Sequence, residues 1–231
     1  MRFFGFPTRE TPAYICIMDT DQRDIAYIHI RPNPSGDDFM VVRQMIESLL
    51  VVAKDRILEK NVFLIESSIG ITKEFISKLV EEEKRFEVVF SSPCTMFYMN
   101  RDQRRTLAEM DLQQSGADGY TFSEVDVPGE DRLAQLPSSA IRAPNGDLAA
   151  WELTHTFGQI SHLFCLPEHR GKGLGVKAEL KLAQKLAQGN YRVYKHVGTH
   201  NEAVWKASDR HPMLTKYEKD TWCFTIFKKC E

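Results

Sequence analysis

A glycine-rich segment in the second half of the chain holds the residue types best suited to binding a charged ligand. It reads Arg170-Gly171-Lys172-Gly173-Leu174-Gly175 and follows an apolar run that begins at Leu163. Glycines at alternate positions let a backbone approach a ligand closely, so several N–H groups and a helix start can converge on a phosphate. The segment from Leu163 to Gly175 therefore predicts a strand, a turn and a helix start that bind phosphate, although the glycines alone fit a purely structural turn equally well.

Two familiar phosphate-binding loops do not match this segment. A Walker A loop ends in Gly-Lys-Ser/Thr, whereas Gly175 is followed by Val176 and Lys177. A Rossmann fingerprint needs its third glycine one residue later and a βαβ unit near the start of a domain. The sequence offers neither.

The turn instead resembles the Arg/Gln-x-x-Gly-x-Gly/Ala turn of the GNAT acyltransferase superfamily, matched by Arg170, Gly173 and Gly175. The stretch from 137 to 206 is similar to the C-terminal part of glycine N-acyltransferase-like proteins. Its landmarks, in chain order, are Pro144-Asn145-Gly146, Trp151 with Leu153, Leu166-Pro167-Glu168 with Arg170, and Asn201-Glu202-Ala203. A weaker likeness at Thr95-Met96-Phe97-Tyr98-Met99 indicates that the first half is a divergent amino-terminal domain of the same family.

This resemblance implies that acyl-CoA is the donor substrate and that no metal takes part. The pantetheine arm would lie against the strand before the turn, with the Cys165 N–H as a candidate donor to the thioester oxygen. We interpret Cys165 itself as a small buried residue and not as a nucleophile, because acyl transfer in this superfamily is direct. The implied cofactor-binding residues are Phe164, Cys165, Leu166, Arg170, Gly171, Lys172, Gly173, Leu174, Gly175, Val176 and Asn201.

Direct transfer to a small amine, such as glycine or another amino acid, needs a base for the amine and a proton donor for the leaving thiolate. The related enzymes resemble one another in a Thr-Gly-Glu whose glutamate is the proposed base, but this chain has Phe157-Gly158-Gln159. Gln159 cannot accept a proton, although it can orient water or the amine. The nearby substitutes are Glu152, His155 and His162, and the thiolate donor is Ser208 or, further away, Tyr217. We predict Gln159, His162 and Ser208 as the catalytic residues.

The acceptor side of the site departs further from these relatives. They carry two helices before the Pro-x-Gly hairpin, whereas the segment from 126 to 137 has room for one short helix. The acceptor pocket is then open, built from the first half of the chain, or absent. The alternative function is a catalytically impaired acyl-CoA-binding protein on a GNAT scaffold. An interaction domain on that scaffold is a third hypothesis, against which Arg170 and the glycines argue.

The elements that must position these residues predict an α+β fold, with a mixed but mostly antiparallel sheet flanked by helices. The 231 residues suffice for one body with two halves, and the polar stretch from 113 to 119 marks a boundary between domains 1–115 and 116–231. The predicted strands cover 13–18, 25–30, 61–66, 86–90, 95–99, 120–125, 140–142, 149–156 and 159–166. Helices are predicted after Asp37, from Thr72, and from the glycine turn to Gly189.

Composition restricts the partners and the compartment. A net charge of -2 argues against a protein that binds nucleic acid through bulk positive charge. The apolar runs are far shorter than the roughly 20 residues that span a bilayer, and the amino terminus lacks a signal-peptide core. The five cysteines are scattered without a C-x-x-C pair, which is typical of a reduced compartment. We therefore expect an intracellular protein, cytoplasmic or alternatively mitochondrial, whose partners are small molecules; the oligomeric state stays open.

Overall fold

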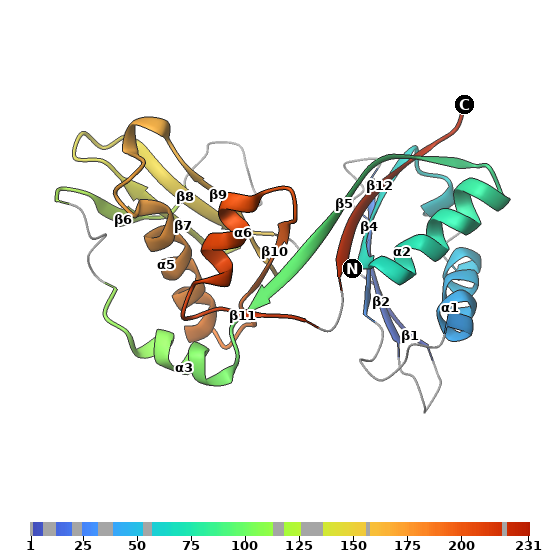
Figure 1. The fold of residues 1–231 in the computed structure, drawn as a ribbon, viewed down its shortest axis with the longest axis horizontal. Helices are drawn as coiled ribbons and strands as arrows, with labels where there is room; N and C mark the ends of the chain where they lie inside the picture. Colours follow the sequence, from blue (N-terminus) through green and yellow to red (C-terminus); the bar gives the residue numbers. More distant parts are fainter. Residues whose placement is uncertain are drawn as a thin grey trace. The chain divides into compact units, whose positions relative to one another are not determined.

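The chain folds into two compact units (Figure 1). A computed structural model describes residues 2–6, 13–19, 25–31, 39–52, 57–112, 118–125, 136–155, 158–218 and 221–231. The first unit is built from Met1–Thr95, Gly198–Asn201 and Glu218–Glu231, and the second from Met96–Val197 and Glu202–Tyr217. Each unit therefore draws on distant parts of the sequence.

A mixed sheet forms the framework of the first unit. Its strands lie in the order β1-β2-β3-β4-β12-β5, with β3 and β4 parallel and the other neighbouring pairs antiparallel. Their bounds are β1 Arg2–Phe6, β2 Ala13–Asp19, β3 Ile25–Arg31, β4 Val62–Ser68, β12 Trp222–Lys229 and β5 Phe86–Tyr98. The C-terminal strand β12 thus lies between β4 and β5, two strands that precede it by well over one hundred residues.

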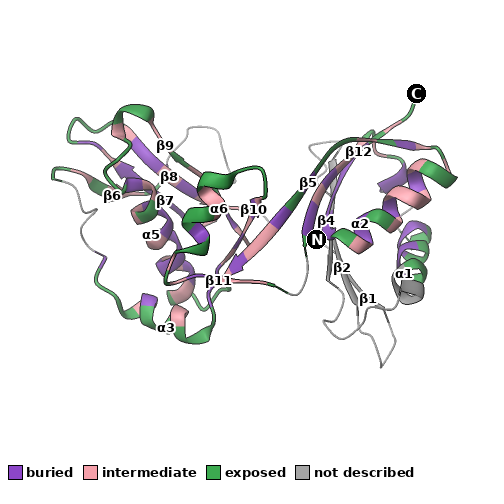
Figure 2. Ribbon diagram, viewed as in Figure 1, coloured by how far each residue is buried: buried purple, intermediate pink, exposed green. Residues whose placement is uncertain are grey.

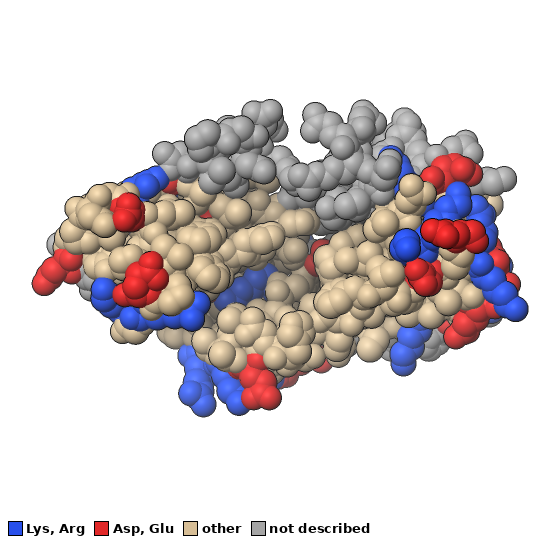
Figure 3. All heavy atoms as spheres, turned by 90° about the horizontal axis from the view of Figure 1, so that it is seen from above, with Lys and Arg blue, Asp and Glu red and all other residues tan. Residues whose placement is uncertain are grey.

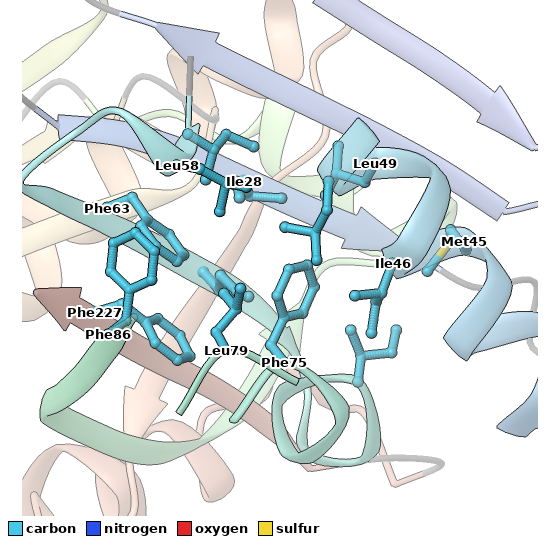
Figure 4. Packing of buried hydrophobic residues seen from close by; sticks show 14 residues of the cluster. Ile28, Met45, Ile46, Leu49, Leu58, Phe63, Phe75, Leu79, Phe86 and Phe227 are labelled. Carbon is cyan, nitrogen blue, oxygen red and sulfur yellow. The ribbon is translucent and has the colours of Figure 1, made fainter. Parts of the chain in front are cut away.

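Helices and aromatic rings make the core of the first unit. Helix α1 spans Phe39–Val52, and α2 spans Ile69–Ile76 and continues as a π-helical segment, η2, over Ser77–Glu82. The Phe63 ring stacks on Phe227 at 4.9 Å and meets Phe86 edge-on at 5.0 Å. Figure 4 shows Leu79 and Phe75 next to these rings, and Met45, Ile46 and Leu49 of α1 farther along the same buried cluster. The helix with apolar spacing that was expected after Asp37 is confirmed as α1, in which Met45, Ile46 and Leu49 are buried.

The surface of the first unit carries both signs of charge side by side. Lys78 and Arg43 both pair with Glu82, at 3.1 Å and 2.9 Å. Figure 3 shows basic and acidic side chains next to one another on this unit.

A second sheet and its helices form the second unit. The order is β6-β7-β8-β9, and every neighbouring pair is antiparallel. Helix α5 packs across β7, β8 and β9, and α3 packs against α5. The bounds are α3 Arg101–Glu109, β6 Thr121–Ser123, β7 Ser138–Arg142, β8 Leu148–Thr154, β9 Ile160–Cys165, η3 Pro167–His169, α5 Leu174–Gln188, β10 Tyr194–Gly198, α6 Glu202–Asp209 and β11 Thr215–Lys216.

The inner face of α5 explains why this helix fixes the strand–turn–helix segment. Leu174 and Ala178 pack on Ile141 and Ala150 of the sheet, while Leu182 and its neighbours join a second cluster towards β10. Figure 2 shows the sheet-facing side of α5 buried and the turn before it exposed. The apolar residues along one face of α5 therefore hold the start of the helix, and the glycine turn before it, next to the end of β9.

The expected fold class is confirmed: antiparallel strands and flanking helices form a mixed α/β protein. Two strand predictions need correction. The segments 86–90 and 95–99 are not separate strands, because β5 continues through Pro93, whose carbonyl accepts the Thr199 N–H at 2.9 Å. Pairing with distant strands outweighs the local turn signal of Ser91-Ser92-Pro93. Strands β1 and β12 were not predicted.

The predicted domain boundary lies in residues 113–117, outside the described residues, so the division into 1–115 and 116–231 stays a prediction. The shortened segment before the hairpin also lies mostly outside them, over 126–135. Among the described helices, none is long and apolar enough to cross a membrane.

Candidate functional site

The glycine turn has the backbone geometry that its residues predict. Gly171 and Gly173 adopt φ values of +78° and +72°, in the left-handed region that favours glycine. A Cβ at either position would meet nothing within 4 Å, so the turn opens onto free space. Gly173 is also the N-cap of α5 and has no side chain to accept the first helical N–H groups. These groups and the positive end of the helix dipole therefore suit an anion.

Arg170 connects the turn back to β9. Its Nε donates to the Cys165 carbonyl at 3.0 Å, and its guanidinium lies 5.7 Å from the centre of the Phe164 ring. These contacts hold a cation beside the turn while leaving the side chain exposed.

Lys172 is held on the turn by residues that the sequence did not point to. Its Nζ donates to the Tyr120 hydroxyl at 2.7 Å and lies 5.1 Å from the centre of that ring. The same hydroxyl lies 2.9 Å from Nδ1 of His169. Tyr120 comes from the start of the sheet, 52 residues before Lys172, so no local spacing in the sequence could have paired them.

The outer edge of β9 offers one backbone donor next to the turn. Among the described strands, β9 pairs with β8 alone. The Leu166 N–H donates to the Ala149 carbonyl at 2.9 Å. Because hydrogen-bonding direction alternates along an antiparallel pair, the Cys165 N–H points away from β8. Of the predicted pantetheine contacts, the Cys165 N–H therefore lies on the outer edge of the sheet. The Leu166 N–H is already hydrogen-bonded to β8.

The Cys165 thiol fits the interpretation of a small structural residue. Burial raises the pKa of this thiol above its ordinary value, and the positive charge of Arg170 opposes that effect. A raised pKa leaves little thiolate at neutral pH, which is the nucleophilic form. The four cysteines with described side chains, Cys94, Cys165, Cys223 and Cys230, are all free thiols.

His162 lies on a β-bulge of β9. Trp151 pairs with Phe164 and Leu153 pairs with Ser161, so Glu152 of β8 faces the two residues between them. His162 adopts a φ of +60°, a conformation that is uncommon outside glycine. Its side chain is exposed, with Nδ1 2.9 Å from the Ser161 hydroxyl. Bulges commonly redirect side chains beside functional sites, and the predicted catalytic role of His162 stays a prediction.

Gln159 contacts a histidine that sequence reasoning missed. Its Oε1 lies 2.7 Å from Nδ1 of His196, on β10. An amide oxygen only accepts hydrogen bonds, so Nδ1 of His196 is the donor. The two residues are 37 positions apart, and no motif in the sequence links them.

Glu152 faces the interior beneath α5. It is 1% exposed, and its Oε2 accepts no hydrogen bond from the described residues. Burial raises the pKa of the Glu152 carboxyl well above its ordinary value, the charge of Glu179 raises it further, and Lys195 opposes the shift. Lys195 itself forms a buried ion pair with Glu179. Because it is buried and faces Glu179 and Lys195, Glu152 is a poor substitute for the missing base.

The remaining predicted residues are Ser208, Tyr217 and Asn201. Ser208 is buried in α6, and its hydroxyl donates to the Val204 carbonyl at 2.8 Å. The Tyr217 N–H donates to the Met96 carbonyl. Asn201 is exposed, follows β10, and belongs to the first unit. Within the described part of the chain, no group of three or more His, Cys, Asp or Glu side chains could hold a metal ion.

The glycine turn lies within the part of the chain that matches known proteins. A family model described as FR47-like protein matches residues 140–207, which include β8, β9, the turn and α5. Glycine N-acyltransferases of Homo sapiens and Pongo abelii are each 35% identical to this chain over 76 residues. These matches cover 33% of this chain and 26% of each relative, so the chain is aligned with about a quarter of their length.

Solved structures share the fold over nearly the whole chain. A Drosophila protein solved by X-ray crystallography has a TM-score of 0.66 at 13% identity, covering 94% of this chain and 74% of that protein. A GCN5-related N-acetyltransferase from Kribbella flavida has a TM-score of 0.52 at 14% identity, covering 99% and 90%. One from Sphaerobacter thermophilus has a TM-score of 0.50 at 9% identity, covering 96% and 81%. At these identities the likeness concerns the fold alone.

The fold is shared with GCN5-related N-acetyltransferases, and residues 140–207, which include the glycine turn, match the FR47-like family model. The part of the chain that carries the turn resembles the GNAT superfamily and, within it, is similar to glycine N-acyltransferase.

Proposed function

We propose that this protein is an acyl-CoA-dependent N-acyltransferase that acts on a small amine such as glycine or another amino acid. The observation that carries the proposal is the turn at Gly171 and Gly173, which leads into an open helix start directly after the outer-edge N–H of Cys165. The turn and Arg170 suit the pyrophosphate of coenzyme A, and the β9 edge suits its pantetheine amides.

The proposed reaction is a direct transfer. The amine nitrogen attacks the thioester carbonyl carbon, a C–N bond forms, the C–S bond breaks, and the amine proton passes to a base while the thiolate is protonated. The Cys165 N–H is the proposed donor to the carbonyl oxygen as negative charge develops on it. The similarity to glycine N-acyltransferase supports an amino acid as acceptor.

The second candidate is an acyl-CoA-binding protein that has lost catalysis. Gln159 favours this alternative, because an amide stands where related sequences have the proposed glutamate base.

Two measurements on the full-length protein test both functions. Calorimetric titration with coenzyme A, acetyl-CoA and longer acyl-CoA thioesters is expected to show binding. A free-thiol assay over a panel of amino acids and other small amines is expected to show thiol release with at least one acceptor. Absence of donor binding would reject both candidate functions. Donor binding without thiol release for any amine would reject the transferase and support the acyl-CoA-binding protein.

A further inference from the structure

The two cations of the glycine turn, Arg170 and Lys172, are held by different parts of the sheet. Arg170 bonds to the Cys165 carbonyl at the end of β9 and lies beside the Phe164 ring. Lys172 bonds to Tyr120, which directly precedes β6. Strands β7 and β8 lie between β6 and β9 in the strand order. The two positive charges are therefore supported separately and do not depend on one common partner.

Tyr120 holds the Lys172 side chain by two contacts. Its hydroxyl accepts a hydrogen bond from Nζ at 2.7 Å, and its ring centre lies 5.1 Å from the same atom. These contacts restrict a long side chain before a ligand arrives, and the entropy cost of ordering it on binding falls accordingly. A phenol hydroxyl and an aromatic ring carry no formal charge. Tyr120 therefore orients the ammonium without cancelling its charge.

His169 holds the Tyr120 hydroxyl from the other side of the turn. Its Nδ1 lies 2.9 Å from the phenol oxygen, and the two rings meet edge-on with centres 5.7 Å apart. His169 ends η3, directly before Arg170. The phenol thus bridges His169 and Lys172, which stand on the two sides of Arg170 and Gly171 in the chain.

The backbone and the core fix the position of Tyr120 itself. Gly119, just before it, has a φ of +77°, and a Cβ there would lie 2.8 Å from Cγ of Pro144. Glycine allows this close approach to the hairpin between β7 and β8. The Tyr120 ring packs against the cluster that contains Ile141 and Leu174, the first residue of α5. The support of Lys172 is consequently built into the second unit.

Coenzyme A carries two separate anionic groups on its ribose, a diphosphate at the 5′ position and a monophosphate at the 3′ position. The glycine turn and Arg170 suit the diphosphate. Lys172, held apart from Arg170, suits a second anion, and a phosphate monoester binds an ammonium through strong charge-assisted hydrogen bonds. Dephospho-coenzyme A keeps the diphosphate and lacks the 3′-phosphate, so it isolates the second group.

We propose that Lys172 binds the 3′-phosphate of the acyl-CoA donor and that Tyr120 is the positioning residue that orients its ammonium. This inference rests on the proposed function and adds a specificity, the selection of coenzyme A over dephospho-coenzyme A. An ammonium has three protons to donate. One goes to the Tyr120 hydroxyl, and the other two are available to the phosphate oxygens. No covalent bond is made or broken.

The first experiment is calorimetric titration of the full-length protein with coenzyme A and with dephospho-coenzyme A. The selectivity ratio is the dissociation constant of dephospho-coenzyme A divided by that of coenzyme A. We expect a ratio of at least about ten in the wild type, since a hydrogen bond between charged groups contributes about that factor. Lys172→Met is expected to bring the ratio to within about twofold of one and to leave the affinity for dephospho-coenzyme A nearly unchanged. Equal weakening for both ligands would place Lys172 at the diphosphate and overturn the assignment.

Lys181→Met is the matched control for this change. Lys181 lies in α5 beyond the turn, and its Nζ is 5.5 Å from the centre of the Phe122 ring of β6. It therefore combines a positive charge with an aromatic neighbour, as Lys172 does, away from the glycine turn. The variant is expected to keep the wild-type selectivity ratio. A ratio that falls equally in Lys172→Met and Lys181→Met would reflect overall charge and would reject a site at Lys172.

The second experiment tests Tyr120 as a positioning residue. Tyr120→Phe keeps the ring and removes the hydroxyl, so the selectivity ratio is expected to fall about three- to fivefold, less than in Lys172→Met. In the Lys172→Met background, the same substitution is expected to change the ratio by less than about twofold, because Tyr120 acts through Lys172. Circular dichroism confirms that each variant is folded. Equal loss of affinity for both ligands in both backgrounds would mean a purely structural role and would reject the positioning role.

The wild-type titrations separate this inference from the proposed function. If the protein binds neither coenzyme A nor dephospho-coenzyme A, the proposed function and the inference are both rejected. If it binds the two ligands with equal affinity, the 3′-phosphate site is rejected and donor binding remains.

Discussion

At the scale of single residues, Gly173 is where the turn depends most directly on the absence of a side chain. Its φ of +72° favours glycine, and the space beyond its Cα is open to a ligand. We predict that Gly173→Asp weakens coenzyme A binding at least about tenfold, or ~1.4 kcal/mol. The strained backbone and a carboxylate beside the phosphates both oppose binding. Calorimetric titration of the folded variant measures the loss.

Gly146 supplies the matched control for this change. It has a φ of +88° and nothing within 4 Å of an added Cβ, but it lies in the hairpin between β7 and β8. Gly146→Asp imposes the same backbone cost and the same charge away from the turn, so coenzyme A affinity should stay within about twofold of the wild type. Equal weakening by both substitutions would mean that the effect on binding is not local to the turn.

At the scale of elements, α5 covers a buried group of charges that the sequence does not reveal. Glu152 of β8, Glu179 of α5 and Lys195 of β10 are each at most 6% exposed. Burial and Glu179 raise the pKa of the Glu152 carboxyl. Its contribution to stability is therefore complete below the ordinary carboxyl range and is lost as pH rises through the raised pKa. The wild type should therefore lose stability from this group as the solution becomes more alkaline.

Glu152→Gln tests that pH dependence. Glutamine resembles the protonated glutamic acid in shape and cannot ionise, so the variant should match the wild type at pH 4 and exceed its unfolding free energy at pH 9 by roughly 1–3 kcal/mol. Urea unfolding at both pH values measures the difference. A stability difference that does not change with pH would show that Glu152 does not carry the proton.

The two partners of the buried ion pair should not be equivalent. Lys195→Met leaves Glu179 without its cation next to Glu152 and should cost about 3–5 kcal/mol. Glu179→Gln should cost less, because the Glu152 carboxyl can then ionise beside Lys195, whose charge already favours that form. Denaturant unfolding of the two variants at pH 7 compares their unfolding free energies. A larger loss of unfolding free energy in Glu179→Gln than in Lys195→Met would show that Glu152 does not replace Glu179 as the partner of Lys195.

At the scale of the whole molecule, sequence reasoning succeeded where the signal is local. The strand, turn and helix from Leu163 to Gly189 were predicted because glycine spacing, apolar periodicity and the helix end all lie within a short segment. It failed where partners are remote. β12 joins β4 and β5 across more than one hundred residues, and Gln159 meets His196 across 37. Such pairings leave no periodic trace, because each partner alone has an ordinary local sequence.

The division into two units leads to a last prediction about how the molecule responds to coenzyme A. The turn, β9 and α5 all belong to the second unit. Ligand bound to folded protein adds RT ln(1 + [L]/Kd), about 2.7 kcal/mol at a hundredfold excess over Kd. Scanning calorimetry with coenzyme A should therefore raise the transition in which the second unit melts by several degrees, and Gly173→Asp should reduce that rise while Gly146→Asp keeps it. A shift of equal size in both variants would place the stabilising ligand away from the turn and would remove the main support for an acyl-CoA site there.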